Sequence, residues 1–316
     1  MKLWACDAVK LILEKVLARI EAGDPFYGQQ LSRRVTALGA SHAENAAAYF
    51  ERYDSALRLD GKSIDFAVDC YLKLSSDMTA ERLNFVRTGK YANSSYKEVE
   101  QKIYANPAIM DYHMHGLALA QYLWPEQYER IQYFQKNLPS FLEECGAYLE
   151  VGGGHGLYAW TALQSLPASA RVDLLDISAS SIKLAQQIIG PSRINYILSD
   201  IFDFRPAQTY DFITAGEIVE HLENPLAFLE KIAALLSPSG AIYFTTSVNA
   251  PMIDHIYLFS NAQEIRDLIA SAGLKIVAEK TASSRELPDR LIAKQKVPVM
   301  YAAFLCKSSL RFRLGH

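Results

Sequence analysis

The chain has 316 residues, half of which are hydrophobic, and its formal net charge is -3 at pH 7. This length allows one large domain or two of ordinary size, and the hydrophobic content excludes extensive disorder away from the termini. The slightly acidic balance argues against a protein that holds nucleic acid through phosphate neutralisation, which requires a basic face.

The apolar residues of the N-terminal segment recur at helical intervals, at Leu3, Val9, Leu13, Val16, Leu17 and Ile20. Asp7 and Glu14 lie among them, which is not typical of a secretory signal. No apolar run approaches the roughly 18 residues that a membrane span requires. We therefore expect a soluble, cytoplasmic protein that has no membrane partner.

Four cysteines are spread along the chain without a C-x-x-C pair, at Cys6, Cys70, Cys145 and Cys306. Neither a zinc site nor a disulfide framework is indicated by that spacing. We expect reduced thiols that are mostly buried.

The first 140 residues are helical in pattern throughout. The 3.6-residue periodicity runs through 43–57, 64–74, 80–85, 96–105, 107–123 and 126–137. Turn residues interrupt it at 23–25, 59–61, 88–89 and 123–125. We predict an all-α N-terminal domain over residues 1–140, which serves as a lid, a substrate domain and a platform for a homodimer.

The pattern changes after residue 140, where short apolar runs alternate with helical stretches. The predicted strands are 148–151, 172–176, 194–199, 210–214, 241–246, 274–279 and 299–306. The predicted helices are 157–165, 182–189, 225–236 and 262–272. This alternation predicts an α/β domain over residues 141–316, with a doubly wound, seven-stranded, mainly parallel sheet. Residues 281–296 are polar and indicate an insertion near the mouth of the active site.

A glycine-rich turn follows the first predicted strand in the segment Tyr148-Leu-Glu-Val-Gly-Gly-Gly-His-Gly156. Glycine is needed where the backbone takes a positive φ or approaches a ligand closely. The helix that opens next supplies free N–H groups at the carboxyl-end crevice where α/β sheets bind ligands. We expect a cofactor to contact Glu150, Gly152, Gly153, Gly154 and Gly156.

Acids end the next two predicted strands. Asp176, followed by Ile177, has the position to accept hydrogen bonds from both hydroxyls of a ribose. Asp200 has the position to accept from an adenine amino group, with Ile201 and Phe202 as an apolar wall. Together with the glycine turn, these residues predict a site for an adenosine cofactor.

Glu-Val-Gly-Gly-Gly-His-Gly resembles the first motif of class I S-adenosylmethionine-dependent methyltransferases, and Asp176 and Asp200 match the family's ribose and adenine residues. Residues 210–213 and 236–241 are similar to its fourth strand and to the turn into its fifth. The resemblance covers about residues 148–279. It implies S-adenosylmethionine as cofactor, S-adenosylhomocysteine as product, and a final antiparallel hairpin. His155 stands where the family usually has a small or hydroxyl residue.

A nicotinamide cofactor is the main alternative, because Gly154-His-Gly-Leu-Tyr-Ala159 fits G-x-G-x-x-A. That frame would place the pyrophosphate loop three residues beyond the end of the strand. It also leaves Asp200 without a role.

The segment after the fourth predicted strand contains Glu217, Glu220 and His221, spaced so that one helical turn would place them on one face. It resembles a segment of small-molecule methyltransferases that includes those of ubiquinone synthesis. Three hypotheses remain open: the cluster only lines the pocket, His221 acts as a general base steered by a neighbouring glutamate, or the cluster holds a divalent metal. His255, after the fifth strand, is a further candidate for catalysis.

The substrate is predicted to lie under the helical domain. The polar and aromatic segment 111–125 is a candidate roof for a small, partly aromatic or carboxylated molecule. The candidate substrate residues are Tyr104, His113, Tyr122, Trp124 and Asp254.

The resulting prediction is a methyltransferase that acts on a small molecule by direct displacement, without a nucleic-acid partner and without a committed metal. One alternative is a metal-dependent RNA 2′-O-methyltransferase that uses Glu217, Glu220 and His221, since that class has a similar cluster. The other is a non-catalytic protein that binds S-adenosylmethionine.

Overall fold

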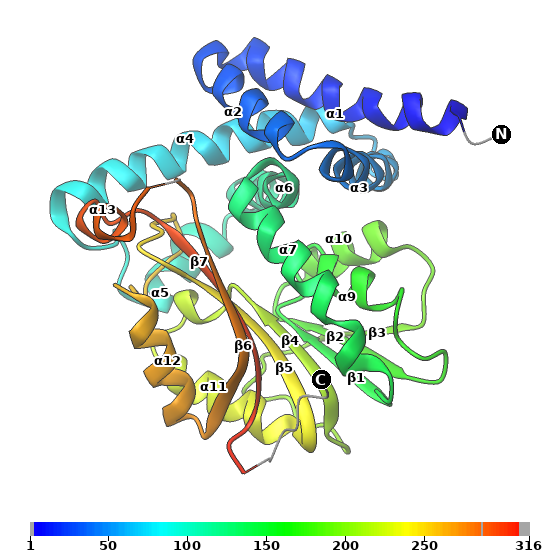
Figure 1. The fold of residues 1–316 in the computed structure, drawn as a ribbon, viewed down its shortest axis with the longest axis vertical. Coiled ribbons are helices and arrows are strands. Elements are labelled where there is room, and N and C mark those ends of the chain that lie inside the picture. The colour runs from blue at the N-terminus through cyan, green and yellow to red at the C-terminus, as the bar shows by residue number, and fades with distance from the viewer. Residues whose placement is uncertain (1–2, 286, 310–316) are drawn as a thin grey trace.

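A computed structural model describes residues 3–285 and 287–309 (Figure 1). Helices form the first part of the chain: α1 (Leu3–Gly23), α2 (Pro25–Ala37), α3 (Ala40–Arg58), α4 (Ile64–Thr88), α5 (Tyr96–Val99), the π-helix η1 (Glu100–Tyr104), α6 (Pro107–Leu123), α7 (Pro125–Asn137) and α8 (Pro139–Leu142). Within these residues, none of the helices combines the length and apolar character that crossing a bilayer requires.

The second part alternates strands with helices, as predicted. The strands are β1 (Ala147–Val151), β2 (Arg171–Asp176), β3 (Ile194–Leu198), β4 (Tyr210–Gly216), β5 (Leu236–Val248), β6 (Leu274–Ser283) and β7 (Val299–Lys307). The intervening helices are α9 (Leu157–Ala162), α10 (Ala179–Ile189), the 3-10 helix η2 (Val219–His221), α11 (Pro225–Leu235), α12 (Ala262–Ser271) and α13 (Asp289–Lys294).

The seven strands form one sheet in the order β3-β2-β1-β4-β5-β7-β6. The first five strands are parallel, whereas β7 runs antiparallel to both β5 and β6. This confirms the predicted seven-stranded, mainly parallel sheet with a final antiparallel hairpin. The carboxyl ends of β1, β2, β3 and β4 therefore meet at one edge, where ligands bind in such folds.

Alternate residues of each strand pack on opposite faces of the sheet. Leu149 and Ile213 pack with Phe228 of α11 and Ile265 of α12 in one hydrophobic core. On the other face, Tyr148 and its neighbours pack with side chains of α7, α8, α9 and α10 in a second core. The parallel strands are thus buried on both faces, which agrees with their continuous apolar runs.

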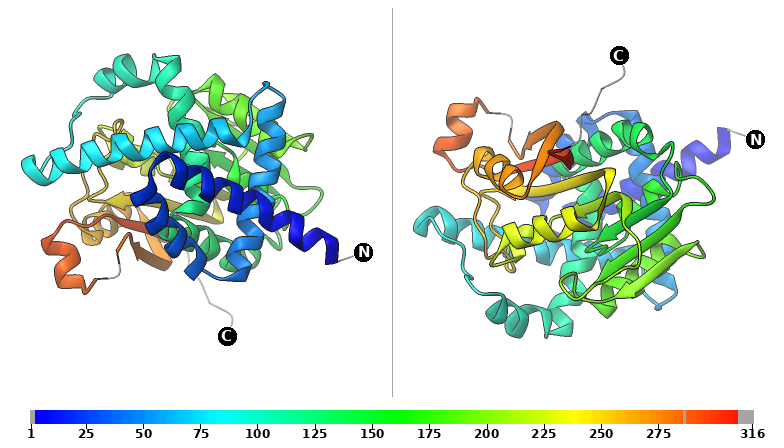
Figure 2. Two further views of the ribbon diagram at one scale, coloured as in Figure 1. Left: turned by 90° about the horizontal axis from the view of Figure 1, so that it is seen from above. Right: turned by 90° about the horizontal axis from the view of Figure 1, so that it is seen from below.

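The helices α1 to α4 cover one end of the sheet, and α6 lies between them and the sheet (Figures 1 and 2). Gly116 permits the close approach of α6 to α4, because a Cβ there would lie 2.9 Å from Cβ of Leu74. The helical core reaches α9 and α10 through Leu157, Leu184 and Ile188. This packing places α6 over the edge where the parallel strands end.

Three elements differ from the expected boundaries. The patterns 64–74 and 80–85 belong to one continuous helix, α4, which ends at Gly89 in the left-handed conformation. The strand β5 begins at Leu236 rather than at 241, and β6 continues to Ser283. The helix α7 packs against β6 and β7 although it precedes residue 140, and the domain boundary placed there stays a prediction.

The cysteines agree with the expectation for reduced thiols. Cys70, Cys145 and Cys306 are buried and free of disulfides. The side chain of Cys6 lies outside the described residues.

Candidate active site

A cavity of about 1700 Å³ lies between the carboxyl ends of the parallel strands and the helical cover. Pockets for one drug-sized ligand usually have about 300–1,000 Å³, so this volume accommodates two ligands side by side. The inserted segment after β6 contributes Ser284 and Arg285 to its lining, in line with the predicted insertion at the mouth. Most of the predicted site residues line it. The exceptions are Gly156, Tyr122 and Glu220.

The glycine turn follows β1 directly. Gly152 and Gly154 have φ of 65° and 49° and line the cavity, where glycine tolerates the left-handed backbone. Gly153 is needed for packing as well, because a Cβ there would come within 2.4 Å of Cδ2 of Leu174. Gly156 also has a positive φ of 72°, but it lies against Ile189 of α10 and not in the cavity. This position gives it a role in close helix packing, and its contact with the cofactor stays a prediction.

The carboxylate of Asp176 is held beside the glycine turn. Oδ2 accepts a hydrogen bond from the backbone N–H of Gly154 at 2.9 Å, and Oδ1 accepts from that of Ser178 at 2.8 Å. Burial raises the pKa of Asp176, while these two N–H groups act in the opposite direction. Each oxygen retains a second lone pair, so the carboxylate is able to accept two ribose hydroxyls from the cavity.

An apolar slot lies next to Asp176. Ile177 is 60% exposed and Phe202 is 38% exposed, although both are large and hydrophobic, and both line the cavity. Ile201, also in the lining, is buried. Oδ1 of Asp200 accepts from the backbone N–H of Phe202 at 2.8 Å, which holds the acid at the rim of the slot. Exposed apolar side chains rimmed by an acid are the environment that the flat face and amino edge of adenine require.

Glu150 lies beneath the glycine turn and is 3% exposed. Its carboxylate accepts a hydrogen bond from the backbone N–H of Ala159 in α9. Burial raises the pKa of Glu150 to about 8. This acid therefore ties β1 to α9, and it also lines the cavity.

Glu217, Glu220 and His221 do not share one helical face, which corrects the prediction. Glu217 has φ of 54°, and the helical turn η2 begins only at Val219. Glu217 therefore points to Arg130, while Glu220 is fully buried and accepts a hydrogen bond from Oγ1 of Thr246 at 2.8 Å. Burial raises the pKa of Glu220 well above its ordinary range, and Glu217 adds to that effect.

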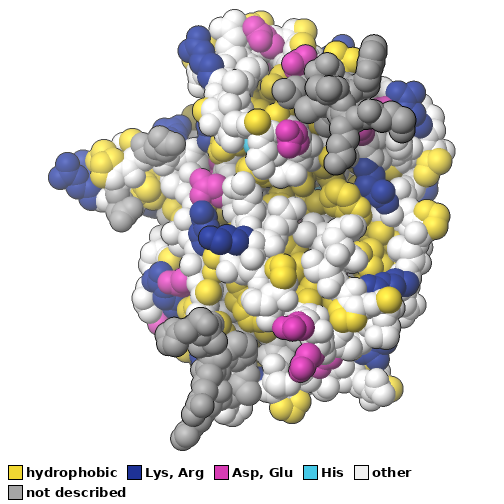
Figure 3. Space-filling model, turned by 45° about the vertical axis from the view of Figure 1, so that its right-hand side comes forward, with side chains coloured by type: hydrophobic (Ala, Val, Ile, Leu, Met, Phe, Trp, Pro, Cys, Tyr) yellow, Lys and Arg dark blue, Asp and Glu magenta, His cyan; other side chains and the backbone are white. Residues whose placement is uncertain are grey.

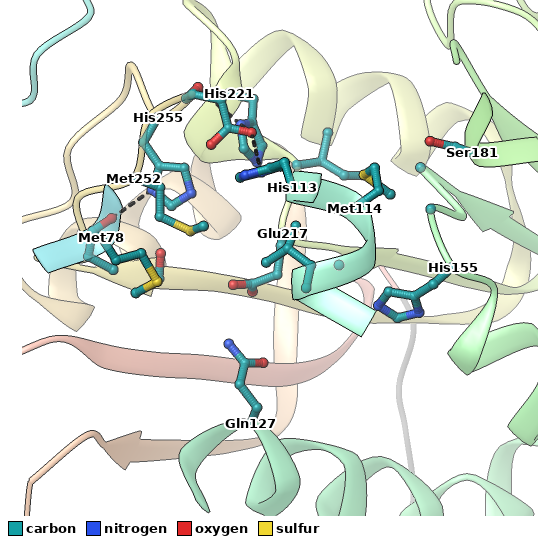
Figure 4. Close-up of a pocket in the computed structure, with 18 of the residues that line it drawn as sticks. Met78, His113, Met114, Gln127, His155, Ser181, Glu217, His221, Met252 and His255 are labelled. Carbon is teal, nitrogen blue, oxygen red and sulfur yellow. Dashed lines mark hydrogen bonds and ion pairs between the residues drawn. The ribbon is translucent and has the colours of Figure 1, made fainter. Parts of the chain in front are cut away.

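His113, His221, His255 and Asp254 form what we call the histidine cluster, at one end of the cavity (Figure 4). Nε2 of His113 lies 3.2 Å from Oδ2 of Asp254, and Nδ1 of His221 lies 3.5 Å from the same oxygen. Burial alone would raise the pKa of Asp254, but the two imidazoles hold it below its ordinary value. A buried carboxylate shared by two histidines orients both rings.

Nδ1 of His221 has two further contacts. Nδ1 lies 3.2 Å from the hydroxyl of Tyr104 and 3.1 Å from the backbone oxygen of Asp254. No hydrogen bond joins its Nε2 to another residue in the described part of the chain. Nε2 is therefore the imidazole atom available to a ligand in the cavity.

His255 is more enclosed than His221. Its Nδ1 is 2.7 Å from the backbone oxygen of Ala250, and its ring lies 4.8 Å from that of His221. Burial, aided by the charge of His221, lowers the pKa of His255 to about 3. This imidazole is therefore neutral at pH 7, which suits a structural role better than proton transfer.

The two aromatic candidates on the roof have different positions. Tyr122 faces the helical core, where its ring stacks on Tyr49 with centroids 4.9 Å apart. This position gives it a packing role in the helical core, and its contact with substrate stays a prediction. Trp124 lines the cavity, and its indole N–H donates to the hydroxyl of Tyr71 at 2.8 Å.

Arg130 was not predicted as a site residue. It is 3% exposed on α7, lines the cavity, and places Nη1 2.8 Å from Oε1 of Glu217. Its Nη2 donates to Gln121 at 3.1 Å. The helical spacing of the sequence indicates this position, because Arg130 falls between Gln127 and Phe134 on the buried face of its helix. Burial and this cation also lower the pKa of His155 to about 4, so that imidazole is neutral at pH 7.

Comparison with known proteins places residues 125–279 in a family described as a methyltransferase domain. The chain is 31% identical over 102 residues to malonyl-[acyl-carrier protein] O-methyltransferase 1 of Ilyobacter polytropus, which covers 32% of this chain and 38% of that protein. It is 31% identical over 137 residues to the ubiquinone biosynthesis O-methyltransferase of Vibrio campbellii, which covers 42% of this chain and 53% of that protein. The chain thus spans about half or less of the length of these relatives.

Among solved structures, the N-methyltransferase NodS of Bradyrhizobium japonicum in complex with S-adenosyl-L-homocysteine is similar, with a TM-score of 0.48 and 17% identity. The match covers 68% of this chain and 99% of that chain. The family match, the strand order and the glycine turn agree with one another. Residues 125–279 belong to the class I, S-adenosylmethionine-dependent methyltransferases.

Proposed function

We propose that the protein transfers a methyl group from S-adenosylmethionine to a hydroxyl group of a small molecule. The observation that carries this proposal is the histidine cluster, in which His221 lines the cavity and Asp254 engages Nδ1, while Nε2 has no hydrogen bond to the described residues. The two relatives compared above are both O-methyltransferases by name.

The cofactor fits the other end of the cavity. Gly152 and Gly154 leave room for a ligand against the backbone, Asp176 accepts from ribose, and the slot between Ile177 and Phe202 takes the adenine ring. S-adenosylmethionine supplies an electrophilic methyl group when bound there. These residues align the methyl group with an acceptor that lies beneath α6.

His221 is the proposed general base. An acceptor hydroxyl that faces Nε2 would lose its proton to this atom as its oxygen attacks the methyl carbon, and the bond from that carbon to sulfur would break to release S-adenosylhomocysteine. The negative charge of Asp254 then stabilises the imidazolium, and the hydroxyl of Tyr104 keeps the ring in place. The buried carboxylate of Asp254 disfavours a second carboxylate nearby, so a neutral hydroxyl suits the site better than an anionic acceptor.

An RNA acceptor receives less support. On the face that Figure 3 shows, Lys and Arg side chains are interspersed with Asp and Glu, and no continuous basic band is seen among the described residues. A protein that follows an RNA backbone needs such a band. A homodimer through the helical region and a cytoplasmic location stay predictions.

Calorimetry and a radiolabelled methyl-transfer assay test the proposal. The protein should bind S-adenosylmethionine and S-adenosylhomocysteine but not NADH, and it should methylate members of a panel of phenols and aliphatic alcohols. His221→Ala should reduce turnover by about 100-fold or more, since a general base contributes about 10²–10⁴-fold, and leave cofactor affinity unchanged.

His42→Asn is the matched control, because His42 is buried but contacts the backbone oxygen of Tyr122 in the helical core. It should retain turnover. Full activity of His221→Ala would reject His221 as the base, and binding of NADH alone would reject the cofactor.

A further inference from the structure

The methionines of this chain are concentrated in the cavity. The sequence contains six, and the five that the structure describes all line it: Met78, Met110, Met114, Met252 and Met300. The buried residues of the three large hydrophobic cores include no methionine in the described part of the chain, although Met114 packs against the helical core and Met300 lies in a small buried cluster with Ala250 and Ala282. Filling of core gaps, the usual use of methionine, therefore explains only part of this distribution.

These five side chains come from four separate segments. Met78 lies on α4, Met110 and Met114 on α6, Met252 in the loop after β5, and Met300 on β7. Figure 4 shows Met252 and Met78 beside His255, at the end of the cavity where the acceptor would react. Met114 lies near the glycine turn, since a Cβ on Gly154 would be 3.6 Å from its Cε.

The same walls are otherwise largely apolar. Leu72, Leu83 and Pro298 line the cavity, and Leu83 is 68% exposed although it is a large aliphatic residue. Polar and charged side chains line the cavity as well, and Arg82, Arg130 and Glu217 are among them. An acceptor therefore meets several polar groups in a wall that also presents apolar side chains.

Methionine has three rotatable bonds and a polarisable sulfur, so it adapts to apolar ligands of different shape and contacts aromatic rings favourably. We propose that these five methionines form an adaptable chamber for an acceptor whose hydroxyl group is borne on an apolar, aromatic body with an extended side chain. This inference rests on the proposed hydroxyl-directed methyl transfer, and it adds the class of molecule that the site accepts.

Calorimetry with 4-alkylphenols tests the chamber on the full chain saturated with S-adenosylhomocysteine. The probes are phenol, 4-ethylphenol, 4-butylphenol and 4-hexylphenol, with 4-hydroxybenzoate as a charged comparison. Affinity should rise about fourfold for each methylene that is buried, which corresponds to about 0.8 kcal/mol, until the chamber is filled. The charged probe should bind more weakly than 4-ethylphenol. Equal affinities along the series would overturn the proposal.

Substitutions at two methionines from different segments locate the effect. Met78→Gln and Met252→Gln should each lower the affinity for 4-hexylphenol by about tenfold or more, because they place an amide in the apolar wall. Met78→Leu and Met252→Leu are the matched controls, and they should remain within about threefold of the native protein. S-adenosylhomocysteine affinity, measured on every variant, shows that each one is folded.

The outcomes separate this inference from the proposed function. If S-adenosylhomocysteine binds and small polar alcohols are methylated while alkyl chains add no affinity, the chamber is rejected and the methyltransferase stands. If alkylphenols bind with the expected increments but no acceptor is methylated, the chamber stands and the proposed reaction fails. Glutamine variants that bind 4-hexylphenol as the native protein does would also reject the chamber.

Discussion

The guanidinium of Arg130 lies 2.8 Å from the carboxylate of Glu217, so that a cation on α7 and an acid just beyond β4 share one wall of the cavity. The Arg130 side chain is 3% exposed and that of Glu217 is 26% exposed. Because a buried cation without a partner is costly, this pair holds α7 to the carboxyl end of the sheet.

Removal of one partner should therefore destabilise the fold. Glu217→Gln is expected to lower the free energy of unfolding by about 1–3 kcal/mol, since Arg130 would keep its charge in a buried position. A double-mutant cycle with Arg130→Met, followed by urea denaturation, measures the coupling between the two side chains. The exposed pair Arg266–Glu279 is the control, and its coupling should stay below about 1 kcal/mol. A coupling below about 1 kcal/mol between Arg130 and Glu217 would contradict the prediction.

Asp176 should determine cofactor affinity. Asp176→Asn is expected to weaken S-adenosylhomocysteine binding by about 10- to 100-fold, because the ribose hydroxyls lose a charged acceptor. Asp173→Asn is the matched control on the same strand, since Asp173 is buried but accepts from Tyr210 and Asn195 away from the cavity. Calorimetry on both variants separates the two roles, and equal losses of affinity would show that the effect is structural.

Glu150 should make stability depend on pH. Its pKa is raised from 4.5 to about 8 in the folded protein, so folding favours the protonated form. The stability that this group contributes is complete below about pH 4.5 and is lost as the pH rises to 8, with a slope of at most about 1.4 kcal/mol per pH unit.

Glu150→Gln should flatten this dependence, because the neutral amide oxygen still accepts from Ala159. Denaturation curves between pH 5 and 8.5 provide the measurement. Glu230→Gln, on the exposed side of α11, should follow the native curve. Parallel curves for the native protein and Glu150→Gln would show that Glu150 does not titrate in this range.

Methyl transfer should not require a metal. Glu220, His221 and His255 bring possible ligand atoms within 4.8 Å of one another. However, burial raises the pKa of Glu220 and so favours a neutral carboxyl, Oε2 of Glu220 is already engaged by Thr246, and Nδ1 of His255 is engaged by a backbone oxygen. Turnover should therefore be unchanged by EDTA, with metal content measured by mass spectrometry. Loss of activity that Zn²⁺ or Mn²⁺ restores would support the metal hypothesis instead.

The cofactor end of the cavity was predictable because its residues follow strand ends. Parallel strands bring their carboxyl ends to one edge, so Asp176 and Asp200 line the same cavity as the glycine turn. Gly156 shows that the spacing of a glycine motif does not by itself identify which glycine contacts a ligand. Its spacing fits the pattern, yet only the packing of α9 against α10 shows that it serves the fold.

The acceptor end depends on contacts that no local pattern encodes. His113 meets Asp254 only because α6 packs between α4 and the sheet, and the left-handed backbone of Glu217 breaks the helical spacing that the sequence suggested. Tyr122 and Trp124 are two residues apart on the roof, but only Trp124 faces the cavity. Tyr49 of α3 stacks on Tyr122, so α3 covers the side of α6 that bears this residue.

The π-helix η1 makes the contact between Tyr104 and His221 depend on the number of residues in this turn. Its wider turn accommodates one residue more than an α-helix would, and Tyr104 at its end reaches His221. Deletion of one residue from Glu100–Ile103 would convert the segment to a regular helix and rotate Tyr104 by about 100° away from the imidazole. Homologous chains that differ by a single residue in this turn would therefore share the fold and lose this contact.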